Sequence, residues 1–453
     1  MAAINDRSLL AHTTCPHCWH EFAPQDVLFV ASHEDLRGDP RLGPDEMLRF
    51  RPSRFNPMGH AFDARNLACQ DMACPRCHLP VPEVLLTAEP FFVSILGTPG
   101  CGKSFYLAAL TWELRQLLPS RFALSFTDAD PTANRVLNAH ESSLFLREAT
   151  GKPTPLASLI SKTELGGNTF FSSVSFGTQQ VLLPKPFLFS LRPGPGHPAG
   201  NSPDLCRVLC LYDNPGEHFD TGADKTDQQT TRHLARAQVL IYLFDPTQDP
   251  RFRQRFREAT QRELPPGAPS RQETVLREAA ARVRRLTGLA AHVRHDRPLF
   301  VVLTKNDVWK PLFPVPGDEP FVTTGGHSGL DRTLMLDRSA ALRKLLVETC
   351  PEVVMAAEDF CSQVIYWPAS PLGRAPVLDP ATRTPCLAPG PIKPVGVTAP
   401  LMFGLNLAMK NLVLIKRKPV PAEAPRTSKT PMPSSPGPSS GRLSPGVSEE
   451  PQS

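Results

Sequence analysis

Segments rich in apolar residues recur along the middle of the chain and alternate with segments whose apolar residues are spaced as on a helix. Six of the apolar segments have the length of a strand, and we expect strands at 91–96, 181–191, 205–212, 239–244, 299–303 and 364–367. Segment 103–118 is expected to be a helix, because its leucines recur every three or four residues. Apolar strands that alternate with helices are typical of a mostly parallel sheet. The pattern therefore predicts an α/β fold.

Composition divides the chain into three regions. Residues 1–88 hold five of the eleven cysteines and few periodic apolar segments, as expected of a small module that a metal ion stabilises. Residues 89–416 carry the α/β pattern, with an arginine-rich helical insert at about 247–297. Residues 417–453 are rich in proline and serine and nearly lack large apolar side chains, so we expect a disordered tail.

Composition and charge exclude several classes of protein. Apolar residues make up 41% of the chain and charged residues 21%, which is the balance of a soluble globular protein. No apolar run reaches the roughly 18 residues of a membrane helix, and the first residues lack the pattern of a signal peptide. We therefore expect a cytoplasmic protein without a membrane span. A net charge of +5 over 453 residues does not indicate nucleic-acid binding.

The strongest chemical signal lies between the first predicted strand and the helix that follows it. Gly97-Thr98-Pro99-Gly100-Cys101-Gly102-Lys103-Ser104, followed by Phe105, matches the phosphate-binding pattern GxxxxGK[ST]. In this pattern the backbone N–H groups converge on phosphates, Lys103 reaches the β- and γ-phosphates, and Ser104 binds Mg²⁺. The alternative is a chance glycine-rich turn with a capping serine. Because a strand and a helix flank the segment, we predict a nucleotide-binding P-loop NTPase fold.

A phosphate-binding loop needs an acidic residue for its Mg²⁺ ion, at the end of an apolar strand. Asp213 and Asp245 both follow such a strand. We prefer Asp213 as a magnesium ligand, because Asp213-Asn214-Pro215-Gly216 supplies a carboxylate together with Gly216, whose N–H can approach the γ-phosphate. A simple turn at the strand end is the alternative for Asp213, and it is the better explanation of Asp245.

A third motif, Thr304-Lys305-Asn306-Asp307, follows directly after the apolar run 299–303. GxxxxGKS, DxPG and TKxD, in this order and each at the end of a predicted strand, resemble the nucleotide-binding boxes of GTPases of the translation-factor-related class. The resemblance implies that Asp307 accepts hydrogen bonds from guanine N1 and N2, and that Lys305 packs over the base. An aspartate suits the two donors of guanine and repels the acceptor N1 of adenine. The alternative is a loop aspartate that caps a helix.

The same resemblance implies a short box near the last strand that contacts guanine through a backbone N–H. Pro368-Ala369-Ser370 is the candidate, with Ser370 departing from the usual Ser-Ala order. Many small GTPases have a water-orienting glutamine after the DxxG glycine, whereas this chain has Glu217 and then His218. Either side chain can orient water, but a carboxylate also repels the γ-phosphate. We therefore expect slow hydrolysis, which leaves enzymatic activity open. The candidates for the switch threonine are Thr163, Thr169 and Thr178.

Two CxxC pairs lie in the N-terminal region, Cys15 with Cys18 and Cys74 with Cys77. Four thiolates in two such turns can close a tetrahedral Zn²⁺ site. The gap between the pairs exceeds the usual gap of about 15–20 residues, which implies a zinc ribbon or treble clef with a large inserted loop. Other candidate ligands are Cys69, His20 and His78. The alternative is a set of unrelated buried cysteines.

A CPxC pair ahead of one set of GTPase boxes resembles bacterial TRAFAC-clade GTPases of the double-GTPase type, over about residues 10–415. Membership implies a switch or assembly protein. We expect it to bind GTP or GDP with Mg²⁺, to hydrolyse GTP slowly, and to work with a protein partner or activator in a bacterial conflict or signalling system. Two alternatives remain: an ATPase that uses the same loop, and a zinc-scaffolded interaction protein whose nucleotide is structural. The arginine-rich insert is either a solvated helical surface or a surface for an anionic partner.

Overall fold

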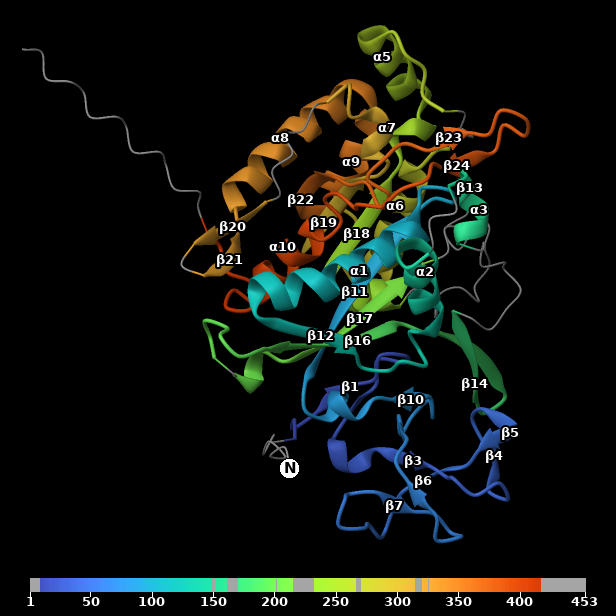
Figure 1. The fold of residues 1–453 in the computed structure, drawn as a ribbon. Coiled ribbons are helices and arrows are strands. Elements are labelled where there is room, and N and C mark those ends of the chain that lie inside the picture. The colour runs from blue at the N-terminus through green and yellow to red at the C-terminus, as the bar shows by residue number, and fades with distance from the viewer. Residues whose placement is uncertain are drawn as a thin grey trace, which may run out of the picture. The chain divides into compact units, whose positions relative to one another are not determined.

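A seven-stranded mixed sheet forms the centre of the computed structural model (Figure 1). Five neighbouring strands are parallel, and β16 runs antiparallel to the strands on both of its sides. Across the sheet the strands are β12 (Leu124–Asp128), β16 (Phe187–Pro193), β17 (Arg207–Asp213), β11 (Glu89–Gly97), β18 (Val239–Phe244), β19 (His295–Leu303) and β22 (Cys361–Pro368).

The structure describes residues 9–147, 151–160, 170–200, 202–214, 232–265, 270–313, 320–324 and 326–416. All of these described residues belong to one compact unit, Met1–Arg417. Several residues named above lie outside the described residues, namely Thr163, Thr169, Gly216, Glu217, His218 and the predicted tail 417–453. In the described part of the chain, none of the helices has the length and apolar character that a membrane span needs.

Five of the six expected strands are confirmed in the central sheet, as β11, β17, β18, β19 and β22. The strand expected at 205–212 begins only at Arg207, because residues 203–205 form a 3-10 turn. The single strand expected at 181–191 was wrong, because the structure divides this segment between β15 (Gln179–Pro184) and β16. Prolines at 184 and 186 lack the backbone N–H that a continuous ladder requires. β15 instead pairs with β14 (Phe171–Phe176) in a separate hairpin.

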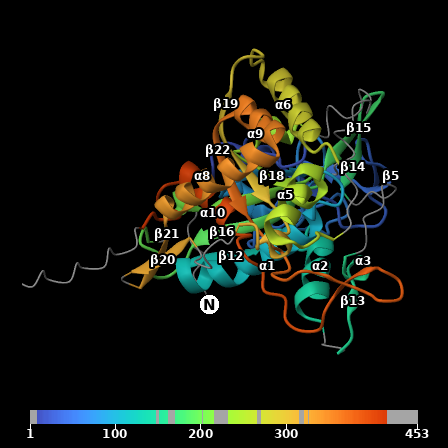
Figure 2. The ribbon, with the colours of Figure 1, turned by 90° about the horizontal axis from the view of Figure 1, so that it is seen from above.

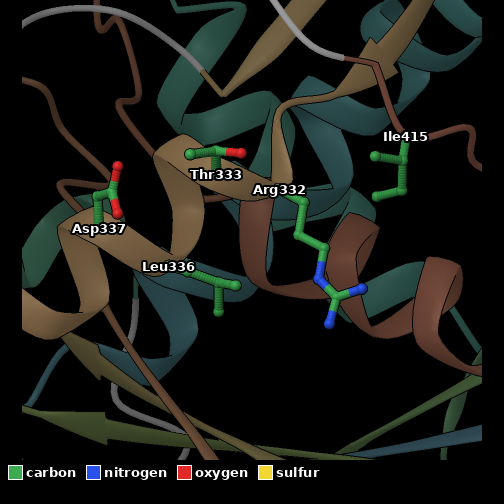
Figure 3. A pocket seen from close by; sticks show the side chains of 5 residues that line it. All are labelled: Arg332, Thr333, Leu336, Asp337 and Ile415. Carbon is green, nitrogen blue, oxygen red and sulfur yellow. The ribbon is translucent and has the colours of Figure 1, made fainter.

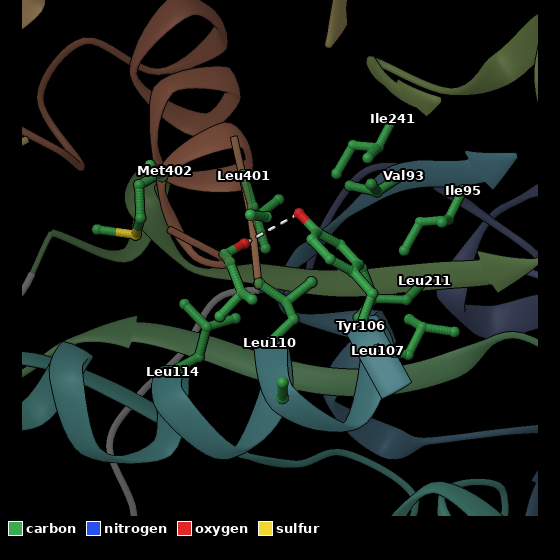
Figure 4. Packing of buried hydrophobic residues seen from close by; sticks show 14 of the residues in the cluster. Val93, Ile95, Tyr106, Leu107, Leu110, Leu114, Leu211, Ile241, Leu401 and Met402 are labelled. Atoms are coloured by element: carbon green, nitrogen blue, oxygen red, sulfur yellow. Dashed lines mark hydrogen bonds between the residues drawn. The ribbon is translucent and has the colours of Figure 1, made fainter. Parts of the chain in front are cut away.

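Helices cover both faces of the sheet. The predicted helix is confirmed as α1 (Lys103–Phe122), which packs on one face together with α10 (Ala399–Ala408). Figure 4 shows this layer, in which Tyr106 donates a hydrogen bond of 2.9 Å to the Val397 carbonyl. The opposite face is covered by α6 (Glu273–Thr287), α8 (Arg332–Thr349) and α9 (Pro351–Phe360), and Figure 2 shows α6 and α9 on the side away from α1.

Packing on both faces of the sheet explains why every residue of β18 is apolar. Its odd-numbered residues, such as Ile241, pack in the core on the α1 side, and its even-numbered residues, such as Tyr242, pack in the core on the α6 side. Successive side chains of a strand point to opposite faces, so a strand covered on both faces needs apolar residues at every position.

The remaining elements of the described core lie at the ends and edges of the sheet. They are α2 (Arg135–Phe145), β13 (Thr154–Pro155), α3 (Leu156–Leu159), η3 (Pro203–Leu205), α4 (His233–Arg236), η6 (Pro246–Gln248), α5 (Pro250–Thr260), α7 (Asn306–Trp309), β20 (Phe321–Thr324), β21 (His327–Leu330), β23 (Val377–Leu378) and β24 (Pro385–Leu387). The arginine-rich insert contains α5 and α6, as its helical composition predicted.

The N-terminal region consists of short strands and two 3-10 turns. Its apolar residues, such as Phe22 and Val81, share one buried cluster with Val208 and Tyr212 of β17. The elements are β1 (Thr13–Thr14), β2 (Glu21–Phe22), η1 (Pro24–Asp26), β3 (Leu28–Val30), β4 (Arg37–Asp39), β5 (Gly43–Met47), β6 (Arg49–Phe50), β7 (Ala61–Phe62), β8 (Ala68–Cys69), β9 (Met72–Ala73), β10 (Pro80–Val81) and η2 (Glu83–Leu86).

Candidate functional site

The glycine-rich segment connects the end of β11 to the start of α1. Gly97 is the last residue of β11, and Lys103 is the first residue of α1. Gly102 precedes the helix with a φ of +95°, a conformation that glycine adopts without strain. A Cβ atom on Gly97 would lie 2.8 Å from the Leu243 carbonyl oxygen and 2.7 Å from Cys101 Sγ. The loop thus depends on glycine at two positions for its path between strand and helix.

Lys103 folds back over the loop. Its ammonium donates hydrogen bonds to the carbonyl oxygens of Gly97, at 2.8 Å, and Thr98, at 3.3 Å. Both acceptors are backbone atoms of the loop, so the positive charge lies at the loop itself. Ser104 and Phe105 form the first turn of α1, where both side chains are half-buried.

Asp213 lies beside the end of β11, the strand that leads into the glycine-rich loop. It is the last residue of β17 and pairs in register with Ile95, two residues before Gly97. The next residue, Asn214, is buried and donates a hydrogen bond of 3.0 Å to the Ile95 carbonyl. The end of β17 is therefore tied to the end of β11, and the predicted magnesium ligand lies next to the strand that leads into the loop.

The two base-recognition candidates contact each other. Thr304-Lys305-Asn306-Asp307 follows β19 directly, and Ser370 lies two residues beyond β22. The Ser370 hydroxyl donates a hydrogen bond to the Asp307 carboxylate, and the Asn306 N–H donates one of 3.1 Å to the Ala369 carbonyl. Burial raises the pKa of the Asp307 carboxyl above its ordinary value, which the hydrogen bond from Ser370 partly offsets.

Lys305 has a partner that the sequence did not suggest. Its ammonium lies 2.5 Å from the carboxylate of Asp245, which is fully buried. Asp245 also accepts a hydrogen bond of 2.9 Å from the Thr247 N–H, which confirms the turn expected at this strand end. Asp245 is therefore both a turn residue and the anchor of Lys305.

Gln272 is a second residue that sequence reasoning missed. Its side-chain amide exchanges two hydrogen bonds with the backbone of Asp245, at 2.9 and 2.7 Å. The same amide oxygen accepts a hydrogen bond of 3.3 Å from the Thr98 hydroxyl. Gln272 stands just before α6, so the arginine-rich insert supplies a buried link between the glycine-rich loop and the Asp245–Lys305 pair. A lone glutamine in a helical insert gives no sequence signal for this role.

These residues share one edge of the sheet. Because β17, β11, β18, β19 and β22 are parallel, their carboxyl ends meet at the same edge, with Gly97 opposite Leu243 and Leu303 opposite Pro368. From β11 the chain continues to β12, on the side of β11 where β17 and β16 lie. It later crosses from β17 to β18, on the opposite side of β11. In open α/β sheets, ligands bind outside the carboxyl ends of strands at such a change of direction.

Of the candidate switch threonines, Thr178 is exposed in the turn between β14 and β15.

The four cysteines of the CxxC pairs form a buried cluster in which all sulfur atoms lie within 4.8 Å of one another. Cys15 Sγ is 3.7 Å from Cys77 Sγ, and Cys18 Sγ is 3.7 Å from Cys74 Sγ. A tetrahedral site with Zn–S bonds of about 2.3 Å has sulfur atoms about 3.8 Å apart. The four residues therefore fit a zinc ion and can hold a metal.

The two pairs have the same local structure. The first pair lies between the paired strands β1 and β2, and the second lies between β9 and β10. The N–H two residues after the first cysteine of each pair points at that cysteine, from His17 to Cys15 Sγ and from Arg76 to Cys74 Sγ, both at 3.4 Å. Burial raises the pKa of the Cys15 and Cys77 thiols well above the ordinary value, so a cation is needed to stabilise their thiolates.

The other proposed metal ligands lie elsewhere. Cys69 contacts Ser32 and Asp63, and His78 binds the carboxylate of Asp39 at 2.8 Å. His20 is likewise outside the four-cysteine group. The cluster is thus complete with four sulfur ligands, which is the arrangement of a structural rather than a catalytic zinc site.

A groove of about 380 Å³ lies away from these sites. It is lined by one turn of α8 and by Ile415, as Figure 3 shows. Its residues are Arg332, Thr333, Leu336, Asp337 and Ile415. None of the predicted site residues lines it, so the groove is separate from both the candidate nucleotide site and the cysteine cluster.

Comparison with known proteins gives a partial similarity. No family model matches the chain. Among curated proteins, the chain is similar to the "Putative ESX-1 scaffolding and assembly protein SaeC" of Mycolicibacterium smegmatis (strain ATCC 700084 / mc(2)155), with 27% identity over 248 residues. The match covers 54% of this chain and 54% of that protein, so the chain spans about half the length of the curated relative it matches.

Proposed function

We propose that the chain is a GTP-binding switch of the P-loop class, with the nucleotide bound at the carboxyl edge of the central sheet. One observation carries the proposal: the GxxxxGKS loop, Asp213 and the contacting pair Asp307–Ser370 follow parallel strands of one sheet and end at one edge. Each motif has a different group to bind: the loop binds the phosphates, Asp213 binds the Mg²⁺ ion, and the Asp307–Ser370 pair binds the base.

Each group of residues has a distinct task in this proposal. The N–H groups of the loop and the start of α1 bind the phosphates, and Lys103 exchanges its two carbonyl partners for phosphate oxygens. Ser104 and Asp213 hold Mg²⁺, which neutralises charge that develops on the γ-phosphate. Asp307 accepts from guanine, with Ser370 orienting its carboxylate. Asp245 holds Lys305 in place beside the base site.

Replacing Asp307 by asparagine is expected to reduce the ratio of GTP affinity to ATP affinity at least about tenfold, because a hydrogen bond to a charged group is worth about 1.5–3 kcal/mol. Affinity for xanthosine triphosphate, whose base has a carbonyl in place of the guanine amino group, should rise relative to GTP. The measurement is equilibrium binding of the three nucleotides with Mg²⁺.

Asp296→Asn is the matched control for this variant, because Asp296 is an exposed carboxylate next to His295. A GTP to ATP ratio that stays unchanged in Asp307→Asn would mean that Asp307 does not read the base.

Intrinsic GTP hydrolysis by the isolated chain is expected to be slow. Glu217 occupies the sequence position of the neutral glutamine that orients the attacking water in many small GTPases, and a carboxylate in that role would repel the γ-phosphate. A partner that supplies an arginine accelerates such reactions by about 10³–10⁵. Single-turnover hydrolysis measures the rate directly. Turnover on the order of one per second without a partner would contradict the expectation.

A second candidate function is that of a zinc-scaffolded interaction protein, and two observations favour it. The curated relative is named for scaffolding and assembly, and the four-cysteine region shares a buried core with the sheet. By analogy, a protein partner is part of both proposals. They differ in whether partner binding depends on which nucleotide is bound: a switch should bind its partner differently in the GTP and GDP forms, whereas a scaffold should bind it equally in both.

A further inference from the structure

Three buried rings lie between the four-cysteine cluster and the central sheet. Trp19 directly follows Cys18, Tyr212 directly precedes Asp213, and His233 is the first residue of α4. The Tyr212 and His233 rings are stacked, with centroids 4.5 Å apart and planes at 7°. The centroid of Trp19 lies 6.2 Å from that of each of the other two rings. The Tyr212–His233 stack, with the tilted ring of Trp19 beside it, thus connects the cysteine cluster with the end of β17.

Hydrogen bonds fix this stack at both ends. The Trp19 indole N–H donates to the Tyr212 hydroxyl at 3.2 Å, and that hydroxyl donates to the Pro16 carbonyl at 2.5 Å. The Tyr212 hydroxyl is therefore held by two residues of the first CxxC turn. At the other end, the His233 ring forms a hydrogen bond of 2.7 Å with Ser94, three residues before Gly97 on β11.

The positions of Pro16 and Trp19 depend on the shape of the CxxC turn. Trp19 has a φ of +54°, and its N–H donates to the Cys15 carbonyl at 3.0 Å. A tryptophan in the left-handed region is held there by its surroundings. A metal ion bound to both Cys15 and Cys18 would join the two ends of this turn and stabilise its shape.

We propose that Tyr212 is a positioning residue that links metal occupancy of the four-cysteine cluster to the placement of Asp213. The inference rests on the proposed function, in which Asp213 binds the Mg²⁺ of the nucleotide. The metal shapes the CxxC turn, the turn holds the Tyr212 hydroxyl, and Tyr212 fixes the last residues of β17. Since coupling between two binding sites is reciprocal, zinc and Mg²⁺–nucleotide must raise each other's affinity by the same factor.

The variant Tyr212→Phe tests this link in the full-length chain. It keeps the stacked ring and removes both hydrogen bonds to the CxxC turn. We expect the Mg²⁺ concentration for half-maximal GTP binding to rise about 5-fold or more, within the usual range of about 5- to 150-fold for coupled sites. GTP affinity measured without Mg²⁺ should stay unchanged, because Asp213 acts through the metal. A merely structural role of Tyr212 would change both values.

Tyr366→Phe is the matched control. Tyr366 is a buried tyrosine of strand β22, and its hydroxyl donates a hydrogen bond of 3.1 Å to the carboxylate of Glu358 on α9. Its substitution should leave the Mg²⁺ dependence unchanged.

Three outcomes of the Tyr212→Phe experiment are distinct. A shift of the Mg²⁺ midpoint alone supports the link. Unchanged values, or equal losses of affinity with and without Mg²⁺, overturn it while leaving the proposed function intact. Absence of GTP binding by the wild-type chain overturns the proposed function, and the link with it.

Wild-type protein provides a second measurement if Tyr212→Phe does not fold. Zinc affinity is determined by competition with a chromophoric chelator, with and without Mg²⁺ and GTP. The account predicts tighter zinc binding, by about 5-fold or more, when Mg²⁺ and GTP are present. Equal zinc affinities under the two conditions would overturn the link.

Discussion

Replacement of Lys103 by alanine is expected to abolish nucleotide binding while the protein stays folded. The ammonium of Lys103 is the cation of the GxxxxGKS loop, and a P-loop without it loses its direct contact with the β- and γ-phosphates. In the structure the half-buried side chain contacts two carbonyl oxygens of the loop, at 2.8 and 3.3 Å. Such partly exposed contacts contribute little to folding, so the melting temperature should change by only a few degrees.

Nucleotide affinity and melting temperature are measured together on Lys103→Ala and on Lys344→Ala. Lys344 is an exposed lysine of α8 and serves as the control for the loss of one positive charge. A folded Lys103→Ala protein that binds GTP as tightly as the wild type would rule out the glycine-rich loop as the phosphate site.

Loss of one cysteine of the four-cysteine cluster is expected to have the largest effect on stability. Structural zinc sites contribute about 10–16 kcal/mol of apparent binding energy in small zinc-finger peptides, and that energy stabilises the fold. Cys15→Ser leaves three sulfur ligands and an incomplete tetrahedron. Elemental analysis should give about one zinc per wild-type chain and almost none for the variant, whose N-terminal region should become sensitive to proteolysis.

Cys69→Ser is the control, because Cys69 is a buried cysteine of the same region that lies outside the cluster. It should retain zinc. A wild-type chain that is fully folded and free of metal would contradict the assignment of a structural site.

The sequence predicted the parts of the fold whose signals are local. Uninterrupted apolar runs identified the parallel strands, because a strand covered by helices on both faces needs apolar side chains at every position. The two CxxC pairs predicted the four-cysteine cluster, because the short spacing alone brings each pair of sulfur atoms to one side of a turn. The failure at 181–191 arose from ignoring Pro184, whose missing N–H ends a ladder.

Contacts between distant segments could not be predicted. Trp19 and Tyr212 are 193 residues apart, and no periodicity or spacing relates them. Gln272 and the Asp245–Lys305 pair likewise come together only through the order of the strands, which depends on how the whole chain packs. The turn at Asp245 was predicted, because a turn depends only on neighbouring residues. Its ion pair with Lys305 was not predicted, because that pair depends on which strands lie side by side in the sheet.

The most direct test of the account is the affinity of the full-length, zinc-loaded chain for GTP, GDP, ATP and ADP in the presence of Mg²⁺. The account predicts that the guanine nucleotides bind at least about tenfold tighter than the adenine nucleotides, a difference of about 1.4 kcal/mol. Binding of no nucleotide at millimolar concentration, or equal or tighter binding of ATP, would contradict it.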